Sequence, residues 1–327
     1  MLRVKNFSLQ LKGTDGRLLP VLEDISLEVA PGTCLGIAGE SGSGKSVLAL
    51  SIAGLFPEGV VCGRSGQIEL DGEQLAGAPD ETLRKLRGQR IGFVFQEPMT
   101  AMNPLMTLYD QIGETVYAHQ KGVSSEEVAA KVLRALTRAG FSQPEKFWNS
   151  YPHQLSGGMR QRAMIAMALV MDPDLIIADE PTTAIDAELQ VQLLAELRQQ
   201  IEAEKRTMIF ISHDLGVLRA VSDFLAVFYC GCLIEKGPTA AILSGPAHPY
   251  TADLVSALPR LVKQRQLPVA IAGNLPPPDR KPSGCVYSDR CRQTRDECRK
   301  RRPPIVRQNG NRQVACFFPL NGSGVAP

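Results

Sequence analysis

One short stretch of the sequence carries the residue types that bind phosphate. It reads Gly39-Glu40-Ser41-Gly42-Ser43-Gly44-Lys45-Ser46, the pattern G-x-x-x-x-G-K-S. Its glycines allow backbone N–H groups to converge on an anion, and the positive end of a following helix strengthens that field. Lys45 can reach the β- and γ-phosphates of a nucleotide, and the Ser46 hydroxyl can ligate Mg²⁺. The stretch therefore predicts a nucleotide phosphate-binding loop, and the alternative is a Gly/Ser turn that matches by chance.

Two adjacent acids, Asp179 and Glu180, end an apolar run that begins after Asp174. A carboxylate at the tip of a buried strand beside a phosphate loop can hold Mg²⁺ through water, which predicts this role for Asp179. The adjacent Glu180 can polarise a water molecule for in-line attack on the γ-phosphate. The alternative is a strand that merely ends in a polar turn.

The segments that must position these residues alternate between strands and helices. The apolar runs Cys34–Ala38 and Val47–Leu50 flank the loop, and they predict a strand before it and a helix after it. The further strands are predicted at 2–11, 25–29, 66–72, 91–95, 174–180 and 207–211, and the helices at 45–55, 80–87, 187–203 and 215–221, with 105–171 mostly helical. Such alternation predicts an α/β fold with a mostly parallel sheet covered on both faces.

A second backbone anion site is predicted where Ser156, Gly157 and Gly158 open a helix. Two anion sites in one chain suggest a composite site that is shared between two molecules. The surrounding stretch from Leu155 to Arg162 resembles the LSGGQ-type signature of the ATP-binding cassette (ABC) family, with Met159 in place of the usual glutamine.

Three other segments resemble further motifs of that family, in the same order along the chain. Gln96 matches the Q-loop glutamine, Thr183-Ala184-Ile185-Asp186 matches the D-loop, and His213 matches the switch histidine. The resemblance implies a P-loop NTPase fold of the ABC type. Its parts are a mostly parallel core sheet, an N-terminal antiparallel β subdomain and a helical subdomain inserted at about residues 97–165, all within an ATP-binding domain of residues 1–245.

The resemblance also implies roles for single residues. Gln96 is expected to bind Mg²⁺ with Ser46 and Asp179, and to sense a membrane partner. His213 is expected to hydrogen-bond the γ-phosphate, and Glu180 to act as the catalytic base. The expected role of Ser156, Gly157 and Gly158 is to bind the γ-phosphate held by the opposite subunit.

One segment departs from the family pattern. An aromatic residue usually stacks on adenine shortly before the second strand, but that region here reads Arg17-Leu18-Leu19-Pro20-Val21. A leucine can pack on the base without π-stacking. The sequence therefore defines the phosphate chemistry better than it defines the affinity or preference for the base.

The segment after about residue 245 resembles the tail of ATPase subunits from oligopeptide, dipeptide and nickel importers. The resemblance lies in His248-Pro249-Tyr250-Thr251, in Pro276-Pro277-Pro278 and in the stretch from Gly284-Cys285 to Cys316-Phe317. The segment from Gln96 to Pro104 also resembles that group, whose nearest type is the first of the two dipeptide-importer ATPases. We therefore expect a C-terminal extension of residues 246–327 beside the ATP-binding domain.

Four cysteines of this extension, Cys285, Cys291, Cys298 and Cys316, have the spacing C-x5-C-x6-C-x17-C. Four thiolates can hold an iron–sulfur cluster or Zn²⁺, and this spacing fits neither the C-x2-C zinc pattern nor the common ferredoxin runs. The resemblance implies a [4Fe–4S] cluster, and Zn²⁺ and free or disulfide-forming thiols stay open. The nearby arginines can offset a negative cluster or form a solvated basic tail, namely Arg290, Arg292, Arg295, Arg299, Arg301 and Arg302.

The composition of the 327 residues limits the possible partners. The net charge is only +2, so we expect no nucleic acid as a partner. The longest apolar run, Ala163–Met171, is far shorter than the roughly 18 residues that cross a membrane. The start, Met1–Lys5, continues into charged and polar residues, so we expect no secretory signal.

The predicted function is ATP hydrolysis that drives a membrane importer of dipeptides or oligopeptides, with ATP and Mg²⁺ bound between two subunits. The resemblance implies a heterodimer with a second, homologous ATPase, two transmembrane permease subunits and an extracytoplasmic solute-binding protein. It places the chain peripherally on the cytoplasmic face of the inner membrane. The alternatives are a nickel or metal-chelate importer, a soluble ABC ATPase without a membrane partner, and a metal-sensing protein.

Overall fold

The computed structural model describes residues 1–182, 187–257, 271–308 and 311–320. It divides into two compact units. Unit 1 comprises Met1–Val29, Leu35–Ala76 and Ser212–Pro327, and unit 2 comprises Ala30–Cys34 and Gly77–Ile211. The predicted D-loop with Asp186 lies outside the described residues.

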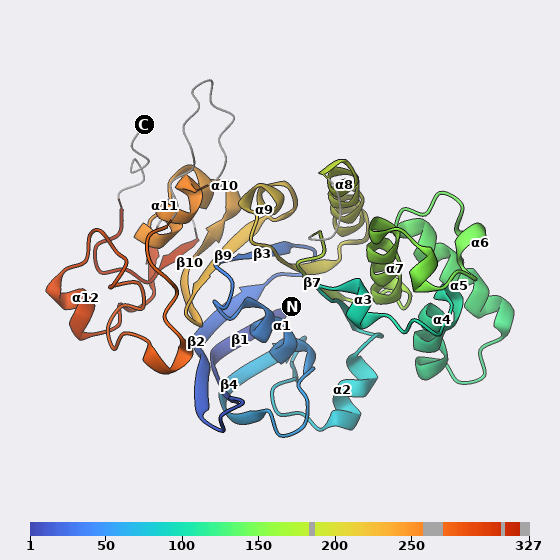
Figure 1. Ribbon diagram of the computed structural model, residues 1–327, viewed down its shortest axis with the longest axis horizontal. Helices are drawn as coiled ribbons and strands as arrows, with labels where there is room; N and C mark the ends of the chain where they lie inside the picture. The colour runs from blue at the N-terminus through green and yellow to red at the C-terminus, as the bar shows by residue number, and fades with distance from the viewer. Residues whose placement is uncertain (183–186, 258–270, 309–310, 321–327) are drawn as a thin grey trace. The chain divides into compact units, whose positions relative to one another are not determined.

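Unit 1 contains a four-stranded antiparallel sheet in the order β2-β1-β4-β5 (Figure 1, blue). The strands are β1 (Leu2–Lys12), β2 (Leu18–Val29), β4 (Val61–Leu70) and β5 (Glu73–Gln74). Along β1 the residues Leu2, Val4, Phe7 and Leu9 are buried, while most of the residues between them are polar. This alternation places one face of β1 on the core, as expected for a sheet covered on one side.

Five further strands of unit 1 follow the order β11-β12-β10-β9-β3. They are β3 (Cys34–Ala38), β9 (Phe224–Tyr229), β10 (Cys232–Pro238), β11 (Val306–Gln308) and β12 (Arg312–Val314). Strands β3 and β9 are parallel, whereas the β9–β10, β10–β12 and β11–β12 pairs are antiparallel. Strand β12 therefore pairs with β10, and β11 pairs with β12 at the outer edge. The sheet contains both parallel and antiparallel pairs.

Helices complete the described part of unit 1. They are α1 (Lys45–Ala53), α9 (Leu215–Val221), α10 (Thr239–Ser244), α11 (Pro249–Ser256), the short 3₁₀ helix η2 (Pro278–Arg280) and α12 (Asp296–Lys300). The Asp214 side chain caps α9 by accepting hydrogen bonds from the Gly216 and Val217 amides. This cap explains why α9 begins at the residue that the sequence predicts.

Unit 2 contains three parallel strands in the order β8-β7-β6. These are β6 (Ile91–Val94), β7 (Leu175–Asp179) and β8 (Thr207–Ile211). Every residue of β7 and β8 is buried, which is typical of a parallel sheet with both faces covered. In the register, Ala178 of β7 lies beside Val94 of β6 and Phe210 of β8. The carboxyl ends of the three strands therefore meet at one edge.

The remaining elements of unit 2 are helices. They are α2 (Asp80–Leu86), α3 (Pro98–Ala101), α4 (Leu108–His119), α5 (Ser125–Arg138), α6 (Pro144–Phe147), the 3₁₀ helix η1 (Pro152–Gln154), α7 (Gly157–Leu169) and α8 (Ala187–Glu204). Helices α4 to α7 gather in one bundle (Figure 1, green). Capping boxes start α4 at Thr107 with Asp110 and α5 at Ser124 with Glu127. Each box satisfies two backbone donors at its helix start.

Much of the predicted secondary structure is confirmed. The strand at 34–38 and the helix at 215–221 have the predicted bounds, and 105–171 is mostly helical. Strand β2 is longer than the predicted 25–29, because it also pairs through Leu18–Leu22 with β1. Across the described residues, every helix is either too short or too polar to pass through a lipid bilayer.

Candidate functional site

The phosphate loop of unit 1 connects the buried strand β3 to helix α1, which is the context that its sequence motif requires. Gly39, Gly42 and Gly44 have positive φ angles of 152°, 80° and 100°. A Cβ atom at Gly39 would lie 2.3 Å from the Phe228 carbonyl oxygen. Only glycine fits the backbone at position 39. The glycine at this position of the motif is therefore required for the shape of the loop.

Helix α1 begins with its first amides lacking a side-chain cap, because Gly44 is the N-cap residue. Lys45 is only 5% exposed, and its Nζ donates hydrogen bonds to the Gly39 and Glu40 carbonyl oxygens at 2.9 and 3.0 Å. The lysine thus lies across the loop. The Ser43 hydroxyl is buried and has no hydrogen-bond partner among the described residues. Uncapped amides, a lysine and a hydroxyl together form a cradle for an anion.

His213 also belongs to unit 1. It is exposed and lies between Ser212, whose amide donates to the Ile37 carbonyl oxygen at 3.2 Å, and the α9 cap Asp214. The hydrogen bond from Ser212 joins the residue before His213 to β3, the strand that leads into the phosphate loop. The histidine is therefore placed by rigid elements on both of its sides.

Unit 2 brings Gln96 and Glu180 together. Gln96 follows β6 and Glu180 follows β7, and Gln96 Nε2 lies 3.3 Å from Glu180 Oε2. The Glu180 backbone has a φ of 48°, a left-handed conformation that is costly for a residue with a side chain. Its amide donates to the Ile211 carbonyl oxygen at 3.0 Å, which helps to hold that turn. Asp179, at the end of β7, is 6% exposed.

The predicted signature residues lie at the start of helix α7 in unit 2. The Ser156 side chain accepts a hydrogen bond from the Met159 amide at 3.3 Å and so caps the helix. Ser156 and Gly157 are exposed, and Gly158 is partly exposed. The motif uses the backbone at position 159, so Met159 in place of glutamine leaves the cap intact. Arg160 Nε donates to the Pro152 carbonyl oxygen at 2.6 Å and braces the preceding turn.

The four cysteines of the extension line one cavity, although the first and last of them are 31 positions apart in the chain. Cys285, Cys291, Cys298 and Cys316 share this cavity with His248 and Thr294. Burial raises the pKa of Cys285 to about 12 and that of Cys316 to about 11. These two thiols therefore stay protonated at neutral pH unless a cation stabilises their thiolates.

Two buried polar atoms beside this cavity have no hydrogen-bond partner among the described residues, His248 Nε2 and Thr294 Oγ1. The other ring nitrogen of His248, Nδ1, accepts a hydrogen bond from the Tyr250 amide at 3.0 Å. Burial lowers the pKa of His248 to about 3, so the ring is neutral and Nε2 carries its proton. Both atoms are donors, and a group with acceptor atoms in the cavity would satisfy them.

The described residues include no group of three or more His, Cys, Asp or Glu side chains arranged as a metal site. The thiol positions alone therefore provide no evidence for Zn²⁺ or a cluster. The cavity and the two unsatisfied donors are nevertheless compatible with a sulfide-bearing group, because sulfide sulfur accepts hydrogen bonds.

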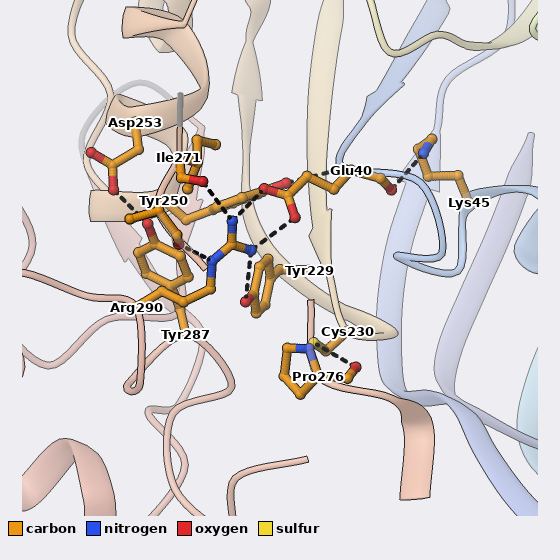
Figure 2. A network of polar contacts seen from close by, with 11 residues as sticks. Glu40, Lys45, Tyr229, Cys230, Tyr250, Asp253, Ile271, Pro276, Tyr287 and Arg290 are labelled. Atoms are coloured by element: carbon orange, nitrogen blue, oxygen red, sulfur yellow. Dashed lines mark hydrogen bonds and ion pairs between the residues drawn. The ribbon is translucent and has the colours of Figure 1, made fainter. Parts of the chain in front are cut away.

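A polar network that the sequence reasoning missed joins the extension to the phosphate loop (Figure 2). Arg290 forms an ion pair with Glu40 at 2.8 Å, and its side chain is 7% exposed. The Glu40 amide donates to Tyr250 Oη at 2.9 Å. Arg290 is therefore not part of a solvated basic tail. No local pattern signals this pair, because its residues are 250 positions apart.

Two families match the sequence. The family described as ABC transporter matches residues 22–183, and the family described as oligopeptide/dipeptide transporter, C-terminal region, matches residues 234–298. The first match includes the phosphate loop, Gln96 and both acids, and the second includes three of the four clustered cysteines.

Several named proteins are similar over nearly their whole length. The probable D,D-dipeptide transport ATP-binding protein DdpD of Escherichia coli (strain K12) is 39% identical over 319 residues, covering 98% of this chain and 97% of that protein. The oligopeptide transport ATP-binding protein AppD of Bacillus subtilis (strain 168) is 36% identical over 300 residues, covering 92% and 91%. The dipeptide transport ATP-binding protein DppD of E. coli is 36% identical over 314 residues, covering 95% of each.

A solved structure shows the same fold. The dimeric post-hydrolysis state of the ATP-binding cassette MJ0796, bound to ADP and Pi, has a TM-score of 0.66 and 29% identity, covering 73% of this chain and 99% of that chain. The predicted α/β fold of the ABC type, with its antiparallel β subdomain, is thereby confirmed. The chain belongs to the ATPase subunits of the oligopeptide/dipeptide family of ABC transporters.

Proposed function

We propose that this chain hydrolyses ATP between two subunits and so drives the import of dipeptides or oligopeptides. The observation that carries the proposal is the phosphate loop of unit 1, where three left-handed glycines, Lys45 and the uncapped start of α1 form an anion cradle. The named relatives transport peptides, so a nickel or metal-chelate importer is not favoured.

The roles of the site residues are part of this proposal. Gly39, Glu40, Ser41, Gly42, Ser43, Gly44, Lys45, Ser46 and Gln96 bind ATP. Oxygen atoms of Ser46, Gln96 and Asp179 would hold Mg²⁺, since a small hard cation prefers oxygen ligands. The ion would offset the negative charge of the phosphates when bound. Glu180 is the base that polarises the attacking water, and His213 donates a hydrogen bond to the γ-phosphate.

The start of α7 supports a site shared between subunits. Ser156, Gly157 and Gly158 present exposed or partly exposed backbone at the positive end of a 13-residue helix. In our proposal they bind the ATP of the partner subunit, and Asp186, outside the described residues, belongs to the D-loop at the same interface. ATP binding then closes the dimer, and hydrolysis reopens it.

A Glu180→Gln substitution tests the catalytic part of this proposal. The amide keeps the side-chain shape but loses the base, so we expect ATP binding to persist while turnover falls about a hundredfold or more. Sedimentation should show an ATP-stabilised dimer of this variant with its homologous partner ATPase. Glu145→Gln, an exposed change on α6, serves as the matched control with normal turnover. Near-normal hydrolysis by the Glu180 variant would remove that residue from its role.

The partners also belong to the proposal. We expect a second, homologous ATPase in a heterodimer, two permease subunits and an extracytoplasmic solute-binding protein, with this chain peripheral on the cytoplasmic face of the inner membrane. Residues 1–245 would form the ATP-binding domain, with a helical subdomain at about 97–165, and residues 246–327 the extension. Co-purification of the tagged chain with permease subunits tests the assembly. Isolation without any membrane subunit would favour a soluble ABC ATPase.

We further propose that Cys285, Cys291, Cys298 and Cys316 bind a [4Fe–4S] cluster. The shared cavity and the two unsatisfied donors, His248 Nε2 and Thr294 Oγ1, support a group that accepts hydrogen bonds. When bound, such a cluster would hold the four thiolates together as a structural or regulatory element. Iron and sulfide analysis of anaerobically purified protein should give four of each per chain. Stoichiometric zinc, or thiols without metal, would contradict the cluster.

A further inference from the structure

Arg290 lies on a turn between two of the clustered cysteines. The Ser288 amide donates to the Cys285 carbonyl oxygen at 3.0 Å, and the Arg290 and Cys291 amides donate to the Tyr287 carbonyl oxygen at 3.1 and 3.0 Å. The backbone of this turn therefore fixes the position from which the arginine side chain leaves. Any rearrangement of Cys285 or Cys291 moves the same turn.

Every N–H group of the Arg290 guanidinium has a partner (Figure 2). Nε donates to the Ala272 carbonyl oxygen at 2.8 Å, and Nη1 and Nη2 donate to the two carboxylate oxygens of Glu40 at 2.8 and 3.0 Å. The remaining two donors bind Tyr229 Oη at 3.1 Å and the Ile271 carbonyl oxygen at 3.5 Å. Five satisfied donors in a fixed fork define one side-chain position, which a lysine cannot reproduce.

Three buried tyrosines surround this ion pair. Tyr229 of β9, Tyr250 of α11 and Tyr287 of the extension have ring centroids 4.6 to 5.2 Å apart. The Arg290 guanidinium lies 5.7 Å from the Tyr229 ring centroid and 5.9 Å from that of Tyr287. The ion pair is thus partly shielded from solvent, with Arg290 buried and Glu40 25% exposed, and it is weakened less by salt than a surface pair would be.

Glu40 is the second residue of the phosphate loop, and the structure holds three of its groups. Its amide donates to Tyr250 Oη, its carbonyl oxygen accepts from Lys45 Nζ, and its carboxylate accepts from Arg290. The role proposed for Lys45 requires its ammonium to turn from this carbonyl toward the phosphates. After that movement the Ser43 amide still donates to the Glu40 carbonyl oxygen at 3.1 Å, Tyr250 still holds the Glu40 amide, and Arg290 holds its carboxylate.

The charge of Glu40 gives this contact a second effect. A carboxylate in a phosphate-binding loop repels the triphosphate unless a cation neutralises it. Arg290 supplies that cation directly, with both of its terminal nitrogens. Loss of Arg290 would therefore release the loop and also expose the nucleotide to an uncompensated negative charge.

We propose that Arg290 is a positioning residue for the ATP site, which clamps and neutralises Glu40 so that the phosphate loop accepts the triphosphate. Through Arg290 the cysteine-bearing turn becomes part of the nucleotide site. The inference rests on the proposed assignment of residues 39–46 as the ATP-binding loop.

The test compares the affinity of a fluorescent ATP analogue for the full-length chain and its variants. Arg290→Gln should weaken binding about tenfold or more, because it misplaces a loop that touches the ligand. Arg290→Lys keeps the positive charge but not the forked guanidinium, so its ATP affinity should lie between those of the original chain and Arg290→Gln. Glu40→Gln combined with Arg290→Gln removes both charges and should recover the part of the affinity that is lost to charge repulsion, while the part that depends on the clamp stays lost. Such recovery distinguishes action through Glu40 from a general loss of structure.

Arg206→Gln is the matched control, since Arg206 is also buried, at 8% exposed, and its Nη2 donates to Asp172 Oδ1 at 2.7 Å within unit 2. It should lower stability while the folded protein binds ATP normally. The inference is overturned if Arg290→Gln binds like the original chain, if Arg206→Gln weakens binding equally, or if the double variant shows no recovery. Lys45→Ala distinguishes failure of the Arg290 inference from failure of the proposed function. Unchanged ATP binding by this variant would refute the assignment of residues 39–46 as the ATP-binding loop.

Discussion

At the scale of single residues, the phosphate loop depends on positions that accept no side chain. Gly39 combines a positive φ with two close neighbours, the Phe228 carbonyl oxygen and Ser43 Oγ, at 2.3 and 2.6 Å from a Cβ built there. Backbone atoms cannot move aside as a flexible side chain can. The residue therefore ties the loop to strand β9, which supplies Phe228.

A Gly39→Ala substitution should therefore weaken ATP binding more than it destabilises the rest of the chain. We expect about a tenfold or larger loss of affinity, since the loop must shift to relieve the overlap. The measurement is titration with a nucleotide analogue alongside thermal unfolding. Gly16→Ala is the matched control, because Gly16 has a φ of 81° but nothing within 4 Å of an added Cβ. Equal effects of the two variants would contradict the steric argument.

At the scale of elements, side chains at the helix starts set helices α4, α5 and α7 of unit 2. Ser124 accepts a hydrogen bond from the Glu127 amide at 3.2 Å, and the Glu127 side chain accepts one from the Ser124 amide at 3.2 Å. This box starts α5, whose residues Val128, Val132 and Leu136 are fully buried. The apolar stripe alone would leave the first turn poorly defined.

Replacing Ser124 with alanine should lower the free energy of unfolding by about 1 kcal/mol, because one helix donor loses its partner. Urea unfolding at constant pH measures this difference. Ser125→Ala, one residue further on at an equally exposed position, should change stability far less. ATP turnover by the folded protein should stay the same in both. If Ser125→Ala proved as costly as Ser124→Ala, the cap would not explain the effect.

The elements also show which features a sequence can reveal. The spacing of apolar residues and the glycine-rich loop predicted β3, α1 and α9 nearly to the residue, since their signals are local. The hairpin β9–β10 and the pair β11–β12 were not predicted. Both strands of the latter have only three residues each, and pairing of β12 with β10 depends on contacts about 78 positions apart. Short strands with distant partners carry little periodic signal.

At the scale of the whole molecule, the same distinction applies to the candidate site. Motif order pointed to Gln96 and Glu180, and unit 2 places their side chains in contact. Motif order gave no reason to join Arg290 to Glu40, and composition grouped this arginine with five others as a possible basic tail. A long-range ion pair becomes visible only once the fold brings its partners together.

The extension is also built into the sheet of unit 1. Glu235 of β10 is fully buried, and Arg312, the first residue of β12, forms an ion pair with it. The Ala247 and His248 amides donate to the same carboxylate at 3.0 and 2.9 Å. A chain shortened to residues 1–245 would lose all of these partners and would expose the backbone of β10.

We therefore expect the 1–245 fragment to be less soluble than the full chain and to form larger particles in light scattering. A chain ending at Leu320, which keeps β11 and β12, provides the control. A monodisperse 1–245 fragment that binds ATP normally would contradict this expectation. It would instead show that the proposed ATP-binding domain folds without its extension.

The pairing of β12 with β10 also has a consequence for biosynthesis. Ribosomes release a protein from its first residue to its last, so Glu235 emerges well before Arg312. During that interval the nascent β10 lacks its β12 neighbour along one edge, and Glu235 lacks its ion-pair partner Arg312. Completion of this layer thus waits until β12 has been synthesised, and a polypeptide that stalls or terminates before Arg312 would be an early target for chaperones and proteases.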